Sequence, residues 1–145
     1  MTDQITQHQE EVHAWAVRKQ WRGPDAETQR TVGDDIALFH SEASEALEAF
    51  RECADPTAVW YSYTVEVQHV KFKDMSAEQV EILTGSTPEE LELIPKPEGV
   101  PSEIADMYIR MVDFCQQYGI NLSEHIAEKL AHNETRELRH GGKHL

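Results

Sequence analysis

The sequence has very few cysteines: only Cys53 and Cys115 occur among 145 residues. Two cysteines cannot form a disulfide framework, and neither has the Cys-x-x-Cys or cysteine–histidine spacing of a zinc site. No run of about 18 apolar residues is present, as a membrane-spanning helix would require. Residues 1–10 are polar and lack the apolar core of a secretory signal. These absences predict reduced cysteines and a cytoplasmic protein.

Positive charge is also scarce. The chain has 13 Lys and Arg against 27 Asp and Glu, a formal net charge of −14. Such a chain repels the phosphates of nucleic acids and anionic membranes, so we expect neither a nucleic acid polymer nor a membrane as partner. It would bind an anion through a metal ion or a local basic patch. The 39% of hydrophobic residues suffice for one core, and the length suits a single domain, 1–145.

Four segments have the periodicity of amphipathic helices. Pro101 suits the start of the third segment, and Gly119 suits the cap after its end. Short polar connections let such helices bury one core by packing on each other. The prediction is an all-α fold, a four-helix bundle. Its helices are expected at Asp3–Gln20, Asp34–Cys53, Pro101–Tyr118 and Ser123–Leu138.

Residues 54–100 lie outside the four helical segments and are predicted to form a small mixed insert between the second and third helices. An alternating pattern over residues 58–72 predicts a strand, bent because it is long for one strand. Residues 76–85 predict a short helix capped by Ser76, and residues 95–99 an extended linker. One face of the strand is expected to carry Val59, Tyr61, Tyr63, Val65 and Val67.

The second helix carries two carboxylates, Glu42 and Glu45, in an unusual place. The apolar stripe expected to face the core consists of Ile36, Phe39, Ala43, Leu47 and Phe50. The two glutamates lie beside this stripe rather than on the polar face. In the third helix, apolar residues cover most of the circumference, which draws Glu103 and Asp106 toward the interior. Because burying unpaired carboxylates is costly, we expect a cation beside them.

Each acidic pair has i,i+3 spacing, so its two side chains project together from one helix. If the pairs face each other, Glu42, Glu45, Glu103 and Asp106 form a cage of four carboxylates. Oxygen-only ligands suit Mg²⁺ or Mn²⁺ and leave positions for phosphate oxygens. A solvated helix face is the competing interpretation, because one such pair arises easily in a chain with 27 acids.

The most basic stretch is the C-terminal one. Residues 129–145 hold four bases against two acids. Lys129, Asn133 and Arg136 follow at i, i+4 and i+7, and Lys143 follows the Gly141-Gly142 pair. Cations and glycine amides near a metal are components of polyphosphate sites. Basic residues at a helix C-terminus also suit the helix dipole, which is the competing interpretation.

Several segments together resemble a known family. They are FHSEASEAL, PSEIADMYIRMVDFCQQYGINL, IAEKLAHNETR and RHGGK. In this order they resemble the MazG-like nucleotide pyrophosphohydrolases, of the all-α NTP pyrophosphatase superfamily. The resemblance implies a MazG-like bundle that assembles as a homodimer or homotetramer, with residues 54–100 as a long insertion.

The resemblance also implies an activity: Mg²⁺-dependent cleavage of a nucleoside triphosphate between its α and β phosphates, with Mn²⁺ as a substitute. It assigns metal ligation to Glu42, Glu45, Glu103 and Asp106. It assigns phosphate or sugar contacts to Lys129, Asn133 and Arg136, and the basic tail adds Lys143 as a candidate for substrate binding. Glu42 or Glu45 would hold or deprotonate the attacking water. Trp15, Trp21 and Trp60 are candidates for stacking on the base, although core packing explains Trp15 better.

Three alternatives stay open. The pairs Glu10/His13 and Glu137/His140 have the Glu-x-x-His spacing of di-iron carboxylate bundles. A non-enzymatic acidic protein could bind a partner through Tyr61, Tyr63 and Val65. A phosphoribosyl-ATP or dNTP-specific pyrophosphohydrolase would share the same motifs.

Overall fold

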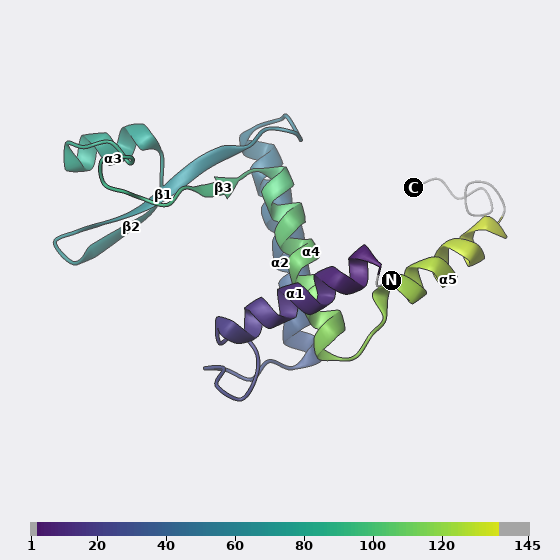
Figure 1. Cartoon of the computed structure of the whole chain (residues 1–145). Helices are drawn as coiled ribbons and strands as arrows, with labels where there is room; N and C mark the ends of the chain where they lie inside the picture. Colours follow the sequence, from purple (N-terminus) through teal and green to yellow (C-terminus); the bar gives the residue numbers. More distant parts are fainter. Residues whose placement is uncertain (1–2, 137–145) are drawn as a thin grey trace. The chain divides into compact units, whose positions relative to one another are not determined.

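A computed structural model describes residues 3–136, which form five helices and three strands (Figure 1). The predicted all-α four-helix bundle is wrong, because the strands form one antiparallel sheet and the fold is mixed α/β. None of the described helices is long and apolar enough to cross a membrane. The helices are α1 Gln4–Arg18, α2 Val32–Glu52, α3 Ala77–Thr84, α4 Val100–Gln117 and α5 Leu122–Glu134, and the strands are β1 Trp60–Val67, β2 Val70–Met75 and β3 Lys96–Glu98.

The predicted helices are confirmed, with changes at their ends. The N-cap of α1 is Asp3, whose carboxylate accepts hydrogen bonds from the amides of Ile5 and Thr6. Helix α5 begins after Asn121 rather than at Ser123, because the Asn121 side chain accepts a hydrogen bond from the Glu124 amide. Helix α5 also ends at Glu134 and not at residue 138, which lies outside the described residues.

The apolar stripe predicted for α2 is not buried as expected. Leu47 is 50% exposed and Phe50 is 42% exposed, whereas Glu42 on the neighbouring arc is only 3% exposed. Ile36 is also exposed. The helix therefore buries Glu42 and leaves apolar side chains exposed in the single chain.

The long alternating segment forms a hairpin instead of one bent strand. Strands β1 and β2 pair antiparallel and are joined by a two-residue turn, Gln68-His69. Both turn residues have positive φ, 51° and 67°. This is the geometry of a type I′ turn, for which Asn-Gly is the usual sequence. Glutamine and histidine carry no such signal, so the turn could not be recognised in the sequence.

The face predicted for β1 is wrong over its first half. Ser62 and Val65 are buried, although they are three positions apart, and Tyr61 is 55% exposed. The pairing register shifts between Tyr63 and Val65, which is the signature of a β-bulge. One additional residue in a strand moves all following side chains to the opposite face. The extra residue lies in β2, because two steps along β1, from Tyr63 to Val65, face three steps along β2, from Met75 to Phe72. Asp74, within this part of β2, has a positive φ of 55°.

The predicted linker 95–99 contributes the third strand. β3 pairs antiparallel with β1, with Trp60 opposite Glu98 and Ser62 opposite Lys96, so the strand order is β2-β1-β3. Helix α3 packs against β1 and is capped by Ser76, as predicted. Its fully buried Val80 contributes to the core of this region together with Val65.

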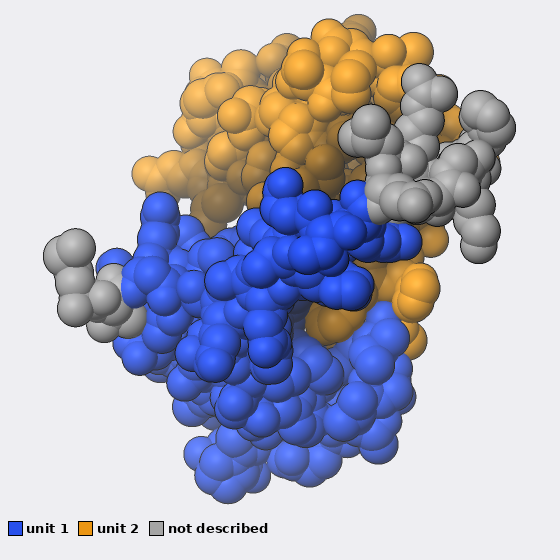
Figure 2. Space-filling model, turned by 90° about the vertical axis from the view of Figure 1, so that its right-hand side faces the viewer, with its two compact units in different colours: residues 1–36, 108–145 blue, residues 37–107 orange. Residues whose placement is uncertain are grey.

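The chain divides into two compact units (Figure 2). Unit 1 comprises residues 1–36 and 108–145, and unit 2 comprises residues 37–107. The core of unit 1 includes Ala16, Val112 and Cys115, the last as expected from its place on an apolar stripe. The predicted insert 54–100 lies entirely within the range of unit 2.

Unit 1 also contains a buried network of charges. The guanidinium of Arg22 donates two hydrogen bonds of 2.9 Å to Asp35 and one of 2.7 Å to Asp113. The other oxygen of Asp113 lies 2.8 Å from Nδ1 of His13. Arg22, Asp35 and Asp113 are each 7% exposed or less. This network connects α1, the segment after it, the start of α2 and the C-terminal half of α4.

Candidate metal centre

Three of the four predicted metal ligands lie together in unit 2. One carboxylate oxygen each from Glu42, Glu103 and Asp106 lies within 4.8 Å of the other two. Glu42 comes from α2, whereas Glu103 and Asp106 are one turn apart on α4. Glu42 and Glu103 are buried, at 3% and 6% exposed, and Asp106 is exposed. The group thus has two buried oxygen donors and one that faces solvent.

Glu45, the fourth predicted ligand, is not one of these three residues. Its side chain is exposed and accepts a 3.0 Å hydrogen bond from the hydroxyl of Ser41. Its charge nevertheless acts on the group, because it contributes to the raised pKa of Glu103. Glu45 therefore lies at the solvent side of the site rather than among the clustered oxygens.

The surroundings of Glu103 raise the pKa of its carboxyl group. Burial raises the pKa of Glu103, and repulsion from Glu45 and Asp106 raises it further. The positive charge of Lys96 lowers the pKa of Glu103, but by less than these effects raise it. A cation among these carboxylates would relieve both the burial and the repulsion. The oxygen-only donor set fits Mg²⁺ or Mn²⁺ better than zinc, which favours nitrogen and sulfur ligands.

A pocket of about 370 Å³ shares Glu45 and Glu103 with this region. Its walls come from α2, from all three strands and from the start of α4, all within unit 2. Six carboxylates and one lysine line it, with the ring of Trp60 as its aromatic wall. The lining residues are Glu45, Glu48, Ala49, Glu52, Trp60, Ser62, Asp74, Lys96, Glu98, Gly99 and Glu103.

Strand β3 brings polar residues to this pocket that were not predicted from the sequence. Nζ of Lys96 lies 2.9 Å and 3.1 Å from the two carboxylate oxygens of Glu98. The hydrogen bond to Glu98 raises the pKa of Lys96, so this side chain is firmly cationic. The hydroxyl of Ser62 donates to the same carboxylate at 2.6 Å. The sequence contained one indication that Lys96 is special, because it is the only Lys or Arg between residues 74 and 106.

The predicted substrate-binding residues belong to a different part of the chain. Lys129 and Asn133 are exposed on α5 in unit 1, and Arg136 is exposed after the end of that helix. Lys129 lines a shallow pocket with His125, Glu128 and His132. Lys143 lies outside the described residues.

Two alternatives can be compared with the structure. His13, from the first Glu-x-x-His pair, is hydrogen-bonded to Asp113 in unit 1 and is not a member of the carboxylate group. His140 lies outside the described residues. Of the surface suggested for partner binding, Tyr61 is exposed and Tyr63 is half-buried, but Val65 is only 5% exposed and belongs to the core.

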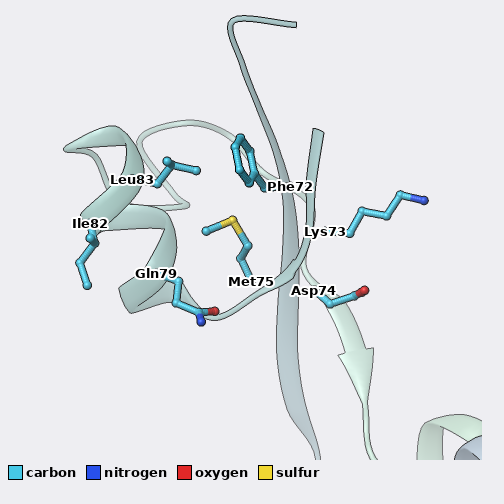
Figure 3. A pocket seen from close by; sticks show the side chains of 7 residues that line it. All are labelled: Phe72, Lys73, Asp74, Met75, Gln79, Ile82 and Leu83. Atoms are coloured by element: carbon cyan, nitrogen blue, oxygen red, sulfur yellow. The ribbon is translucent and has the colours of Figure 1, made fainter. Parts of the chain in front are cut away.

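A second hollow of unit 2, about 510 Å³, lies between β2 and α3 (Figure 3). The side chains of Phe72, Met75 and Leu83 converge there, whereas Ile82 and Lys73 point away. These converging groups are apolar and offer contact surface without reacting groups.

Comparisons with known proteins provide no independent assignment for this site. No protein-family model, curated protein or solved structure matches the chain. The resemblance to MazG-like enzymes consequently stays a prediction from short motifs. The function is therefore inferred from the positions of the clustered carboxylates in the structure.

Proposed function

We propose that the protein is a Mg²⁺-dependent nucleoside triphosphate pyrophosphohydrolase, which cleaves between the α and β phosphates to release a monophosphate and pyrophosphate. The observation that carries the proposal is the meeting of Glu42, Glu103 and Asp106 within 4.8 Å, with two of the three carboxylates buried. A merely solvated acidic face does not bury two carboxylates side by side. The spacing of the two acidic motifs supports a metal site, and the activity is the one that the resemblance to MazG-like enzymes implies.

In this proposal the clustered carboxylates hold the metal. Bound Mg²⁺ would supply Lewis acidity toward the phosphates and lower the pKa of a bound water. Glu45 is the better candidate for the base that takes the proton from water, because it is exposed while Glu42 is buried. The Ser41 hydroxyl, 3.0 Å from a Glu45 oxygen, would orient that carboxylate.

The pocket beside the cluster is the proposed place for the nucleotide. Its Trp60 ring offers a stacking surface, and Lys96 offers the positive charge among its lining residues. On the basis of the sequence motifs, we also propose that Lys129, Asn133, Arg136 and Lys143 contact the phosphate or the sugar. The proposal also places the enzyme in the cytoplasm.

The proposal includes a homodimer or homotetramer. Support comes from apolar side chains that the single chain leaves open on α2 and α4. Leu47, Phe50 and Ile104 are 50%, 42% and 55% exposed. Large exposed apolar side chains on neighbouring turns of a helix are typical of surfaces that a partner covers.

The decisive experiment measures pyrophosphate release from a panel of NTPs and dNTPs, with Mg²⁺ and with EDTA. We expect metal-dependent release that Glu103→Gln and Glu45→Ala each reduce by about 100-fold, because a ligand and the base are lost. Glu78→Gln, which removes the same charge from an exposed position of α3, should leave the rate unchanged. The absence of release from every nucleotide by the folded wild type would refute the proposal.

The role of Lys129 has a separate test. Lys129→Ala should weaken nucleotide binding and leave Mg²⁺ binding unchanged, since a lysine contacts phosphate but does not ligate the metal. Lys71→Ala, another exposed lysine, is the matched control. Equal losses of nucleotide and metal affinity would show that Lys129 has a structural role.

A further inference from the structure

The acidic pocket of unit 2 extends along α2, starting beside the group of three carboxylates. Glu45, Glu48 and Glu52 of this helix line it. A rise of about 1.5 Å per residue places Glu52 about 10 Å beyond Glu45 along the helix axis. Glu103 belongs to both the pocket and the carboxylate group, is 6% exposed, and accepts no hydrogen bond from the side chains of residues 3–136. The pocket therefore joins the proposed metal site to a region two helical turns farther along α2.

The wall that α2 provides can only accept hydrogen bonds. Ionised carboxylates have no proton to donate, and neither Glu48 nor Glu52 accepts a hydrogen bond from another side chain in the described part of the chain. Two donors from the strands, by contrast, are engaged. The hydroxyl of Ser62 and the ammonium of Lys96 both donate to Glu98. A ligand group that lies against α2 must therefore supply the donors itself.

The sheet provides a flat aromatic surface. Trp60, at the start of β1, lines the pocket and is half-buried. Its Cζ3 lies 3.1 Å from the position that a Cβ of Gly99 would occupy, so the ring packs against a glycine, whose φ is +110°. An indole held in this way is suited to stacking a nucleobase. The volume of about 370 Å³ is within the range of small-molecule sites.

The charge of the pocket determines how a nucleotide is oriented in it. Its six carboxylates repel phosphates except where a bound cation lies between them. The phosphates therefore belong at the carboxylate group that would hold Mg²⁺, and the uncharged base belongs farther along α2. We propose that Glu48 and Glu52 read this base and select one with adjacent N–H donors, as guanine has in N1–H and its 2-amino group. This inference rests on the proposed function, since it needs the nucleotide to lie in this pocket.

The preference follows from the donors and acceptors of the bases. A carboxylate accepts two parallel N–H···O bonds from guanine, and such charge-assisted pairs are strong. Hypoxanthine has the same ring but lacks the 2-amino group, so one bond is lost. Uracil and thymine present a single N–H between two carbonyl oxygens, which the carboxylates repel. Glu48 and Glu52 are therefore specificity-determining residues rather than catalytic ones.

The test measures kcat/KM of the whole chain for GTP, ITP and UTP in Mg²⁺. We expect a value for GTP about tenfold above that for ITP, because ITP lacks one charge-assisted hydrogen bond, and a lower value still for UTP. The double variant Glu48→Gln, Glu52→Gln should hydrolyse GTP and ITP equally, since an amide accepts from N1–H and donates to O6 of either base. Glu78→Gln, Glu81→Gln removes the same charge from exposed positions of α3 and should keep the preference.

Uncleavable analogues separate this inference from the proposed function. Binding of α,β-methylene GTP and α,β-methylene ITP is measured by calorimetry for the wild type and both double variants, with thermal unfolding to verify that each is folded. Binding of the GTP analogue about tenfold more tightly, without hydrolysis of any nucleotide, would refute the hydrolase but support the recognition of the base. Equal values for the two purines, no binding of either analogue, or a preference kept by Glu48→Gln, Glu52→Gln would overturn the inference.

Discussion

At the scale of the residue, the buried carboxylate of Glu103 makes stability depend on pH. Burial and neighbouring carboxylates raise its pKa in the folded protein above the ordinary value of 4.5. Between that value and the raised one, the folded state binds more protons than the unfolded state. Stability attributable to Glu103 therefore falls as the pH rises through this window, and the charged form is unfavourable above it.

Glu103→Gln should consequently stabilise the metal-free protein at pH 7, with a rise in Tm of about 3 °C. The advantage should shrink as the pH falls through the raised pKa toward 4.5, and it should be lost below 4.5, where the wild-type carboxylate is protonated in both the folded and the unfolded state. Thermal unfolding in EDTA at several pH values measures the difference between variant and wild type. Glu78→Gln, at an exposed position, is the control. A difference that does not change with pH would contradict an origin in the titration of Glu103.

Arg22 is a buried cation that donates hydrogen bonds to two buried carboxylates, Asp35 and Asp113. Arg22→Met would leave Asp113 with only His13 and Asp35 with only the 3.6 Å contact of Arg30, and breaking a buried ion pair from one side costs about 3–5 kcal/mol. Denaturant unfolding measures this loss. Arg18→Met, at an exposed position of the same segment of chain, should change the free energy of unfolding by about 0.5 kcal/mol or less. A loss below about 1 kcal/mol for Arg22→Met would show that water replaces the arginine.

At the scale of the element, the backbone at Gly99 joins β3 to α4. Its φ is +110°, and a Cβ there would lie 2.4 Å from the carbonyl oxygen of Ala58. Gly99→Ala should therefore lower the free energy of unfolding by more than about 2 kcal/mol, through strain and a backbone clash together. Gly85→Ala is the matched control, because Gly85 also has positive φ, +78°, but has open space where the Cβ would be. Its loss should be about 1 kcal/mol, and equal losses would exclude the clash as the cause.

The helices could be predicted from the sequence because their signals are local. Apolar residues at helical spacing, Pro101 and Gly119 indicated α4 without knowledge of the rest of the chain. The sheet depends on features that have no such signal. The turn uses Gln68 and His69, the bulge places an extra residue in β2, and β3 is a three-residue strand that is defined only by its pairing with β1. Nothing local distinguishes such a strand from an extended linker.

In the candidate site, too, helical spacing along the sequence predicted some positions, whereas contacts between distant segments could not be predicted. Helical spacing placed Glu42, Glu103 and Asp106 on arcs beside apolar residues, and the structure brings them together. Glu45 was assigned to the cluster with its i,i+3 partner, but one turn of helix takes it to the solvent side. Lys96 could not be placed from the sequence, because its approach to the pocket depends on the pairing of β3 with β1.

At the scale of the whole molecule, the net charge of −14 means that any added salt reduces self-repulsion. A general effect of this kind depends on ionic strength and not on the identity of the cation. A metal ion bound at the carboxylate group stabilises the folded protein in addition, and this stabilisation grows with the ratio of metal concentration to Kd. The two contributions are separated by comparing MgCl₂ with NaCl at equal ionic strength.

We expect millimolar Mg²⁺ to raise the Tm of the wild type by about 5 °C beyond the matched NaCl sample. Glu103→Gln should lose this additional rise, although it starts from a higher Tm in EDTA, because the same carboxylate that destabilises the metal-free protein holds the ion. Glu78→Gln, with an identical change in net charge, should respond as the wild type does. The curves of the wild type and Glu103→Gln should therefore converge as Mg²⁺ is added. Parallel curves would mean that Mg²⁺ acts only by screening and that the three carboxylates do not form a metal site.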